Sequence, residues 1–193
     1  MKHLDQSAIN LLSNRLVFEE IHQLKSFFTL LFSEVANGIP LNVLTKTHSG
    51  SQGTKISKGN ELQRCPYQVL DIIRDFDKET GFNIRLLNWW GRGLYVFVFV
   101  GKNNKKLRPR APFLPAMRDE GFRLTKTDSL WDYPKIVDHG CMESTTAPDQ
   151  IEHHVSEFNH VQMVKQIAYS ADYDLLVDSL STQVRLILDL YIR

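Results

Sequence analysis

Residues 82–100 read Phe-Asn-Ile-Arg-Leu-Leu-Asn-Trp-Trp-Gly-Arg-Gly-Leu-Tyr-Val-Phe-Val-Phe-Val, the most apolar, aromatic and β-branched run of the chain. Two segments rich in strand-forming residues are separated by Gly91, Arg92 and Gly93. A short connection that contains glycine favours a tight reversal over a crossover. The sequence therefore predicts a β-hairpin in which residues 82–90 pair antiparallel with residues 94–100.

The second strand of this hairpin is apolar on both faces. Side chains alternate along a strand, so residues 94–100 put four aliphatic side chains on one face and three aromatic ones on the other. Such a strand lies inside a sheet with a layer on each side, or one face is covered by another subunit. We expect this strand to be interior, and a charge at Val98 to prevent folding.

The segments around the hairpin predict helices. Apolar residues recur at three- and four-residue steps over the first 36 residues, with a break at Ser13 and Asn14, and Pro66 begins a helix that runs to Phe76. Two further helices are predicted over 149–169 and 173–192. The predicted class is α+β, a small and mainly antiparallel sheet built on the 82–100 hairpin and covered by the N-terminal, central and two C-terminal helices. A doubly wound parallel sheet is the alternative, but the strands do not alternate regularly with helices.

Composition limits the organisation of the chain. A length of 193 residues with 42% hydrophobic residues suits one core, so we expect a single domain over 1–193. Residues 45–61 are rich in Gly, Ser and Lys, which predicts a mobile loop. A Walker phosphate loop is excluded there, because Thr54 separates Gly53 from Lys55.

The N-terminus lacks a basic region followed by a continuous apolar segment, and no apolar run approaches the roughly 18 residues of a membrane span. The two cysteines, Cys65 and Cys141, cannot build a disulfide framework or an ordinary zinc knuckle. We therefore expect a soluble cytoplasmic protein with no membrane contact.

A net charge of +1 conceals an asymmetry. Residues 1–127 hold 19 Lys and Arg against 11 Asp and Glu, whereas residues 128–193 hold 4 against 11. Basic segments of this kind attract anions, although the acidic C-terminal third can also neutralise them within the fold or across a dimer. The ligand-binding residues predicted from the basic segments and the aromatic hairpin tip are Lys55, Lys58, Arg64, Trp90, Arg92, Arg108 and Arg110.

Two groups of residues suggest metal or catalytic chemistry. His153, Glu157 and His160 have a spacing that puts them on one side of the predicted 149–169 helix, and imidazole and carboxylate groups are ligands for zinc. A solvated helix face has the same composition. Cys65, beside Arg64 at the predicted helix start, has features of a reactive thiol, but the sequence identifies no base for it. No catalytic residue and no cofactor are assigned.

These observations favour a non-enzymatic binding or interaction module for an anionic small molecule or an acidic protein partner. The alternative is an enzyme that uses Cys65 or the His and Glu residues of the 149–169 helix. The near-zero net charge and the lack of a recognisable helix-turn-helix argue against nucleic acid as a partner. The surplus of apolar side chains predicts a homodimer.

Overall fold

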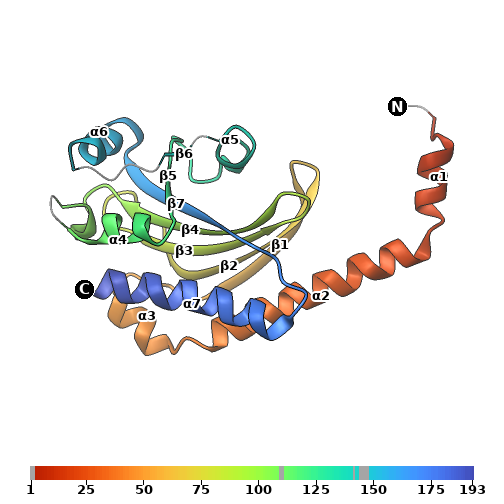
Figure 1. Cartoon of the computed structure of the whole chain (residues 1–193), viewed down its shortest axis with the longest axis horizontal. Helices are drawn as coiled ribbons and strands as arrows, with labels where there is room; N and C mark the ends of the chain where they lie inside the picture. Colours follow the sequence, from red (N-terminus) through yellow and green to blue (C-terminus); the bar gives the residue numbers. More distant parts are fainter. Residues whose placement is uncertain (1–2, 109–110, 141, 144–147) are drawn as a thin grey trace.

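The computed structural model describes residues 3–108, 111–140, 142–143 and 148–193. Within them, seven antiparallel strands form one sheet in the order β1-β2-β3-β4-β7-β5-β6 (Figure 1). The strands are β1 (Lys55–Leu62), β2 (Cys65–Asp75), β3 (Phe82–Trp89), β4 (Gly93–Gly101), β5 (Arg123–Thr125), β6 (Met142–Glu143) and β7 (His160–Ile167). The helices are α1 (Gln6–Leu12), α2 (Arg15–Asn37), α3 (Leu41–Thr47), the 3-10 helix η1 (Lys105–Leu107), α4 (Phe113–Asp119), α5 (Tyr133–Val137), α6 (Pro148–Phe158) and α7 (Tyr173–Ile192). The α+β class predicted from the sequence is confirmed.

The predicted hairpin is present as β3 and β4. These strands pair antiparallel with Phe82 opposite Val100 and Trp89 opposite Gly93. Gly91 has a φ of 74°, a left-handed conformation that glycine adopts without steric cost, and it lets the chain reverse within three residues. β4 lies inside the sheet, because β7 pairs with its other edge. The prediction that this strand is interior is confirmed.

Both apolar faces of β4 are covered by the chain itself. Helices α2 and α7 cover one face, where Val96 and Val98 belong to the larger core cluster (Figure 1). On the other face, Tyr95 and Phe97 pack with Tyr133 and Ile136 of α5 in a second cluster. A second subunit is therefore not needed to cover this strand.

The predicted central helix over residues 66–76 is wrong, because residues 66–75 belong to β2. Residues 69–73 are buried on both faces of the sheet, and a short run that is apolar except for Asp71 fits the period of a buried helix as well as that of a buried strand. Pro66 is near the start of the strand, where a missing N–H is tolerated, and its carbonyl accepts a hydrogen bond from the Trp90 backbone N–H at 3.1 Å.

The loop predicted over 45–61 is largely structured. Its first residues end α3, and residues 55–62 form β1 at the edge of the sheet. Edge strands are often short of apolar residues because one side of their backbone faces solvent, which explains why β1 resembled a loop. A Cβ at Gly59 would lie 2.5 Å from the Tyr67 ring, so this glycine permits the close pairing of β1 with β2.

The helix predicted over 149–169 is only half correct. The helix α6 ends at Phe158, Asn159 has a φ of 58°, and the chain continues as β7 between β4 and β5. Asparagine tolerates this left-handed conformation and so ends the helix. The last predicted helix is confirmed as α7.

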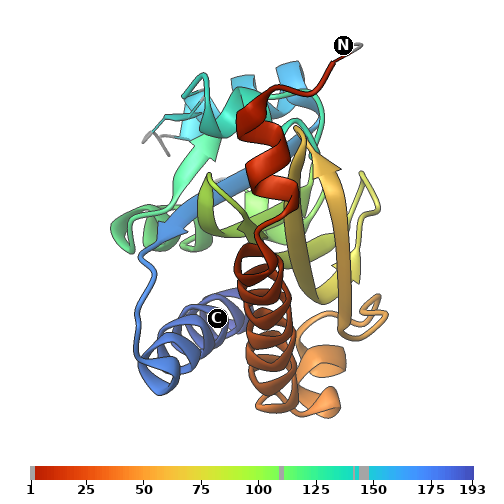
Figure 2. The ribbon, with the colours of Figure 1, turned by 90° about the vertical axis from the view of Figure 1, so that its right-hand side faces the viewer.

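The N-terminal region is helical, with the predicted break at Ser13 and Asn14 between α1 and α2. Among the described residues, no single helix has the length and hydropathy to cross a bilayer, although the bent pair of α2 and α3, at 69°, meets both criteria together. In α2 the four buried side chains, Phe28, Leu31, Phe32 and Val35, all lie in its C-terminal half. Its N-terminal half projects from the body of the molecule (Figure 1), towards the viewer in Figure 2.

Candidate functional site

The residues predicted to bind an anion do not form one site. Lys55 and Lys58 lie on β1, Arg64 lies in the turn between β1 and β2, and Trp90 and Arg92 lie in the turn between β3 and β4. Arg108 follows η1, and Arg110 lies outside the described residues. Sheet pairing places Arg64 and Arg92 at one end of the strands, because Tyr67 is opposite Trp89.

Two of these side chains are occupied by contacts within the protein. A guanidinium nitrogen of Arg92 donates a hydrogen bond to the Asp138 carboxylate, which neutralises its charge. The indole N–H of Trp90 donates to the side-chain oxygen of Gln68 at 2.9 Å. The aromatic hairpin tip is therefore held by contacts within the protein, and Trp90 and Arg92 are not available as a free anion-binding edge.

The structure does not bring the three predicted metal ligands together. His153 and Glu157 lie on α6 with Nε2 and Oε2 3.8 Å apart, but His160 is buried in β7, where its Nδ1 pairs with the Phe158 carbonyl at 2.8 Å. The prediction that all three share a helix face is wrong, since the helix ends before His160. In the described part of the chain, no group of three or more His, Cys, Asp or Glu side chains is placed to hold a metal ion.

Cys65 is the first residue of β2 and pairs with Leu62 across the hairpin. Its side chain is half-buried against the cluster that contains Trp89 and Leu87. It is not at a helix N-terminus, so the structural reason for expecting a reactive thiol no longer applies.

A polar recess brings part of the basic sequence together with the C-terminus of the fold. Its volume is about 450 Å³, and it lies between the end of α3, the turn after β2, η1 and the last turn of α7. We call it the basic recess. The residues that line it are Thr45, Lys46, Thr47, His48, Ser49, Thr80, Asn103, Asn104, Lys105, Arg108 and Tyr191.

One wall of the basic recess is fixed by a chain of hydrogen bonds. His48 Nε2 lies 2.6 Å from the Asp75 carboxylate, and His48 Nδ1 lies 3.4 Å from the Tyr191 hydroxyl. The buried Asn104 amide donates to that hydroxyl at 2.8 Å and to the Thr80 carbonyl at 2.7 Å. Burial raises the pKa of Tyr191, so the phenol stays protonated at neutral pH. Residues from four distant parts of the chain therefore form one rigid wall.

The charge around the basic recess is positive. Lys46, Lys105 and Arg108 are exposed at its rim, and none of them forms an ion pair within the described part of the chain. The neighbouring carboxylates have other partners. Asp75 pairs with His48, while Glu79 accepts from Lys102 Nζ at 2.9 Å and from the Asn103 amide at 2.6 Å. Because Lys46, Lys105 and Arg108 have no ion-pair partner among the described residues, they can bind an anion from solution.

A fourth cation, Lys106, lies behind the wall. Its Nζ is 5.4 Å from the centre of the Tyr191 ring, a distance at which a cation is attracted to an aromatic face. Burial, and then the charge of Lys105, lower the pKa of Lys106. An anion in the basic recess would oppose that shift, because it would stabilise the protonated ammonium.

Sequence reasoning found Arg108 but missed Lys46, His48 and Tyr191. The dense run of basic residues after β4 was the signal for Arg108. His48 and Tyr191 are 143 positions apart and meet because α7 returns to the end of α3, which no local pattern reveals. Comparison of the chain with protein-family models, with curated proteins and with solved structures found no match. Function is therefore inferred from the geometry and charge of the site itself.

Proposed function

We propose that the protein is a non-enzymatic binding module for a small anionic ligand that carries phosphate-type groups and occupies the basic recess. One observation carries the proposal: Lys46, Lys105 and Arg108 surround a recess of about 450 Å³ without a carboxylate partner among the described residues. A concave surface lined by charges of one sign focuses their electric field and raises the local concentration of counter-ions. The size falls in the range of small-molecule pockets, which favours a small ligand over the surface of an acidic protein.

The donor chemistry supports a ligand with several oxygens. The planar guanidinium of Arg108 can donate two parallel hydrogen bonds to a phosphate or carboxylate group, and Lys46 and Lys105 add flexible point charges. The hydroxyl group of Ser49 also lines the recess and can donate to the same oxygens, whereas the Thr80 hydroxyl donates to the Asp77 carboxylate at 3.3 Å. A ligand with two anionic groups satisfies this set better than a monovalent ion.

The same geometry favours binding over catalysis. A general base needs a nitrogen that faces the substrate, but Asp75 is bonded to one nitrogen of His48 and Tyr191 faces the other. The Thr45 and Thr47 hydroxyls donate to backbone carbonyls of their own helix. The imidazole and these hydroxyls therefore shape the wall and are not poised as a base and a nucleophile.

Pyrophosphate at constant ionic strength provides a direct test. A ligand that binds the folded state alone stabilises it by about 2.7 kcal/mol at one hundred times its Kd. For a chain of this size, we expect pyrophosphate to raise Tm by about 5–10 °C in a saturable way. Sodium chloride at matched ionic strength should give a small and non-saturating change, because it acts by screening. Calorimetric titration then gives the stoichiometry and the affinity.

Matched variants locate the effect. Lys105→Ala and Arg108→Ala each remove a rim cation and should weaken pyrophosphate binding at least tenfold without changing the Tm of the free protein by more than about 2 °C. Lys55→Ala and Lys58→Ala remove exposed cations of β1 outside the basic recess and should leave binding unchanged. Equal responses to pyrophosphate and chloride, or equal losses from all four variants, would contradict the proposal.

A further inference from the structure

The first helices of the protein carry an unusual amount of exposed apolar surface. Residues 3–24, which we call the arm, comprise α1 and the N-terminal part of α2 and project from the body (Figures 1 and 2). The structure exposes thirteen large apolar side chains in its described part, of which seven lie on the arm. These seven are Leu4, Ile9, Leu11, Leu12, Leu16, Phe18 and Leu24. An apolar concentration of this kind on a soluble domain marks an interaction surface.

The arm continues the apolar stripe that holds α2 on the sheet. Phe28, Leu31 and Val35 are buried in the core, and Leu24, Ile21 and Val17 extend the same stripe outward. Their spacing alternates between three and four residues, the pattern by which two helices pack along a shared seam. We call the part of this stripe formed by Val17, Ile21 and Leu24 the seam. Leu24 is 48% exposed, so the body of the protein does not cover the seam where α2 leaves it.

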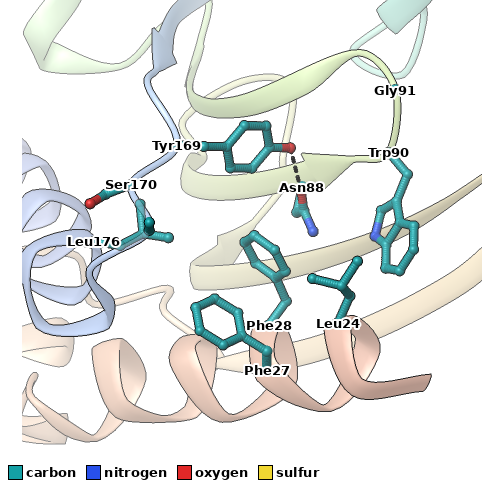
Figure 3. Close-up of a pocket in the computed structure, with 10 residues that line it drawn as sticks. Leu24, Phe27, Phe28, Asn88, Trp90, Gly91, Tyr169, Ser170 and Leu176 are labelled. Carbon is teal, nitrogen blue, oxygen red and sulfur yellow. Dashed lines mark hydrogen bonds between the residues drawn. The ribbon is translucent and has the colours of Figure 1, made fainter. Parts of the chain in front are cut away.

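An apolar cavity lies where the arm joins the body. Its volume is about 460 Å³, and Figure 3 shows Leu24, Phe27 and Phe28 of α2 facing Trp90 and Tyr169 across it. All ten residues that line the cavity are uncharged. The cavity therefore suits apolar side chains more than an ionic ligand.

The polar groups of this cavity are already paired with one another. The Tyr169 hydroxyl donates to the Asn88 oxygen at 2.7 Å (Figure 3). The Asn88 amide donates to the Gln68 oxygen at 2.9 Å. Gln68 Nε2 in turn donates to the Lys25 carbonyl at 3.2 Å. Hydrogen bonds to this cavity would therefore add little to the free energy of binding. The main contribution would come from the burial of apolar surface.

We propose that the arm of a second copy of this chain occupies the cavity, and that the exchange is reciprocal in a twofold dimer. Apart from Leu24, which lines the cavity, the arm cannot enter the cavity of its own chain, because α2 is one continuous helix over residues 15–37. A second copy presents the same arm and the same cavity, as a self-complementary interface requires. A twofold axis between His22 and Gln23 would place two α2 helices antiparallel, with Ile21 level with Leu24 and Val17 level with Phe28 of the other copy.

Charge also favours a second copy as the occupant. The described part of the arm holds Asp5, Glu19 and Glu20 against Arg15, which makes it acidic. Beside the cavity, Lys25 and Lys58 line a small recess together with Gln68, which accepts a hydrogen bond from the cavity residue Asn88. Antiparallel helices about the same axis put Glu20 level with Lys25 of the other copy. Opposite charges would then flank the apolar seam and fix its register.

Light scattering of the full chain at tens of micromolar tests the proposal. We expect a mass twice the 22.3 kDa of one chain. Leu24→Glu should convert the dimer to a monomer, because it places a charge in the seam. Leu30→Glu is the matched control, since Leu30 is 61% exposed on another face of the same helix, and it should leave the dimer intact. Circular dichroism should show both variants folded.

Hydrogen exchange locates the contact. Amides of residues 15–24 should exchange at least tenfold more slowly at high protein concentration than after dilution. Amides of β4 should exchange at the same rate at both concentrations. A mass of one chain at every concentration overturns the proposal, and the seam would then be a surface for a different protein. A dimer that persists in Leu24→Glu, or protection confined to another face, also overturns it.

Discussion

Arg85 and Asp71 form a bidentate ion pair across neighbouring strands, inside the second apolar cluster. Arg85 Nε donates to one carboxylate oxygen at 2.7 Å and Nη2 to the other at 2.9 Å, and the two residues are register partners on β3 and β2. Arg85 also donates to the Tyr133 hydroxyl at 2.8 Å, and its guanidinium lies 4.2 Å from the centre of the Trp131 ring. This pair joins the sheet to α5 and fixes how that face is covered.

Removing one member of this pair should be costly. Asp71→Ala leaves the buried Arg85 charge without its partner, and the expected loss in the free energy of unfolding is about 3–5 kcal/mol. Asp119→Ala is the control, because it breaks a surface pair with Arg118 whose side chains are 44% and 67% exposed, and it should cost less than about 1 kcal/mol. Urea titration of both variants measures the difference. A loss below 1 kcal/mol for Asp71→Ala would show that solvent reaches Arg85.

The hairpin core should not tolerate a charge. Val98 is fully buried and pairs with Ile84 on one side and Met163 on the other. Val98→Asp would place an unpaired carboxylate in an apolar interior, at a cost of several kcal/mol that is comparable with the whole stability of a domain. We expect loss of the cooperative thermal transition by circular dichroism. Lys58→Asp, on the exposed edge strand β1, should fold normally, and a folded Val98→Asp protein would be inconsistent with this core.

Two buried histidines should make stability depend on pH. Burial lowers the pKa of His154 to about 4, and burial also lowers the pKa of His160; the Nε2 atom of each has no hydrogen-bond partner among the described residues. Between pH 6.5 and 4, His154 is protonated in the unfolded chain but stays largely neutral in the folded protein. Stability should therefore be highest above pH 6.5 and fall as the pH decreases towards 4.

His154→Leu should flatten that part of the pH profile, because it removes a group that titrates differently in the two states. His153→Leu is the control, since His153 is the neighbouring residue on α6 and its side chain is 82% exposed. Urea midpoints measured at half-unit steps from pH 4 to 7 give both profiles. An unchanged slope in His154→Leu would mean that His160, whose pKa burial also lowers, dominates the dependence.

Local sequence patterns predicted the elements whose composition favours one structure. The β-branched and aromatic residues of β4, the glycines of its turn and the helical stripe of α7 each point to one structure. β2 was missed because Val69-Leu70-Asp71-Ile72-Ile73 is buried on both faces and fits either period, so pairing with β1 and β3 decides its conformation. The basic recess was found only in part, since its wall joins residues far apart in the chain and depends on the path of α7.

The last prediction links a close backbone contact to the basic recess. A Cβ at Gly101 would lie 2.8 Å from the backbone oxygens of Asp77 and Glu79, in the turn that carries Thr80 to the recess. Gly101→Ala should push this turn away from β4 and disturb the Lys102 N–H bond to the Lys78 carbonyl, 2.9 Å in the native protein. We expect a loss of about 1–3 kcal/mol, the usual cost of overpacking.

If that turn helps to form the binding site, Gly101→Ala should also reduce the stabilisation by pyrophosphate. Gly38→Ala is the control, because a Cβ there meets its nearest atoms at an ordinary 3.5 Å and Gly38 has a helical φ of −69°. It should be neutral or slightly stabilising, since alanine loses less backbone entropy on folding than glycine. Equal Tm values for the two variants would contradict the predicted overpacking at Gly101, and equal pyrophosphate responses would show that this turn does not affect the recess. A selective loss in Gly101→Ala would connect the packing of β4 to anion binding.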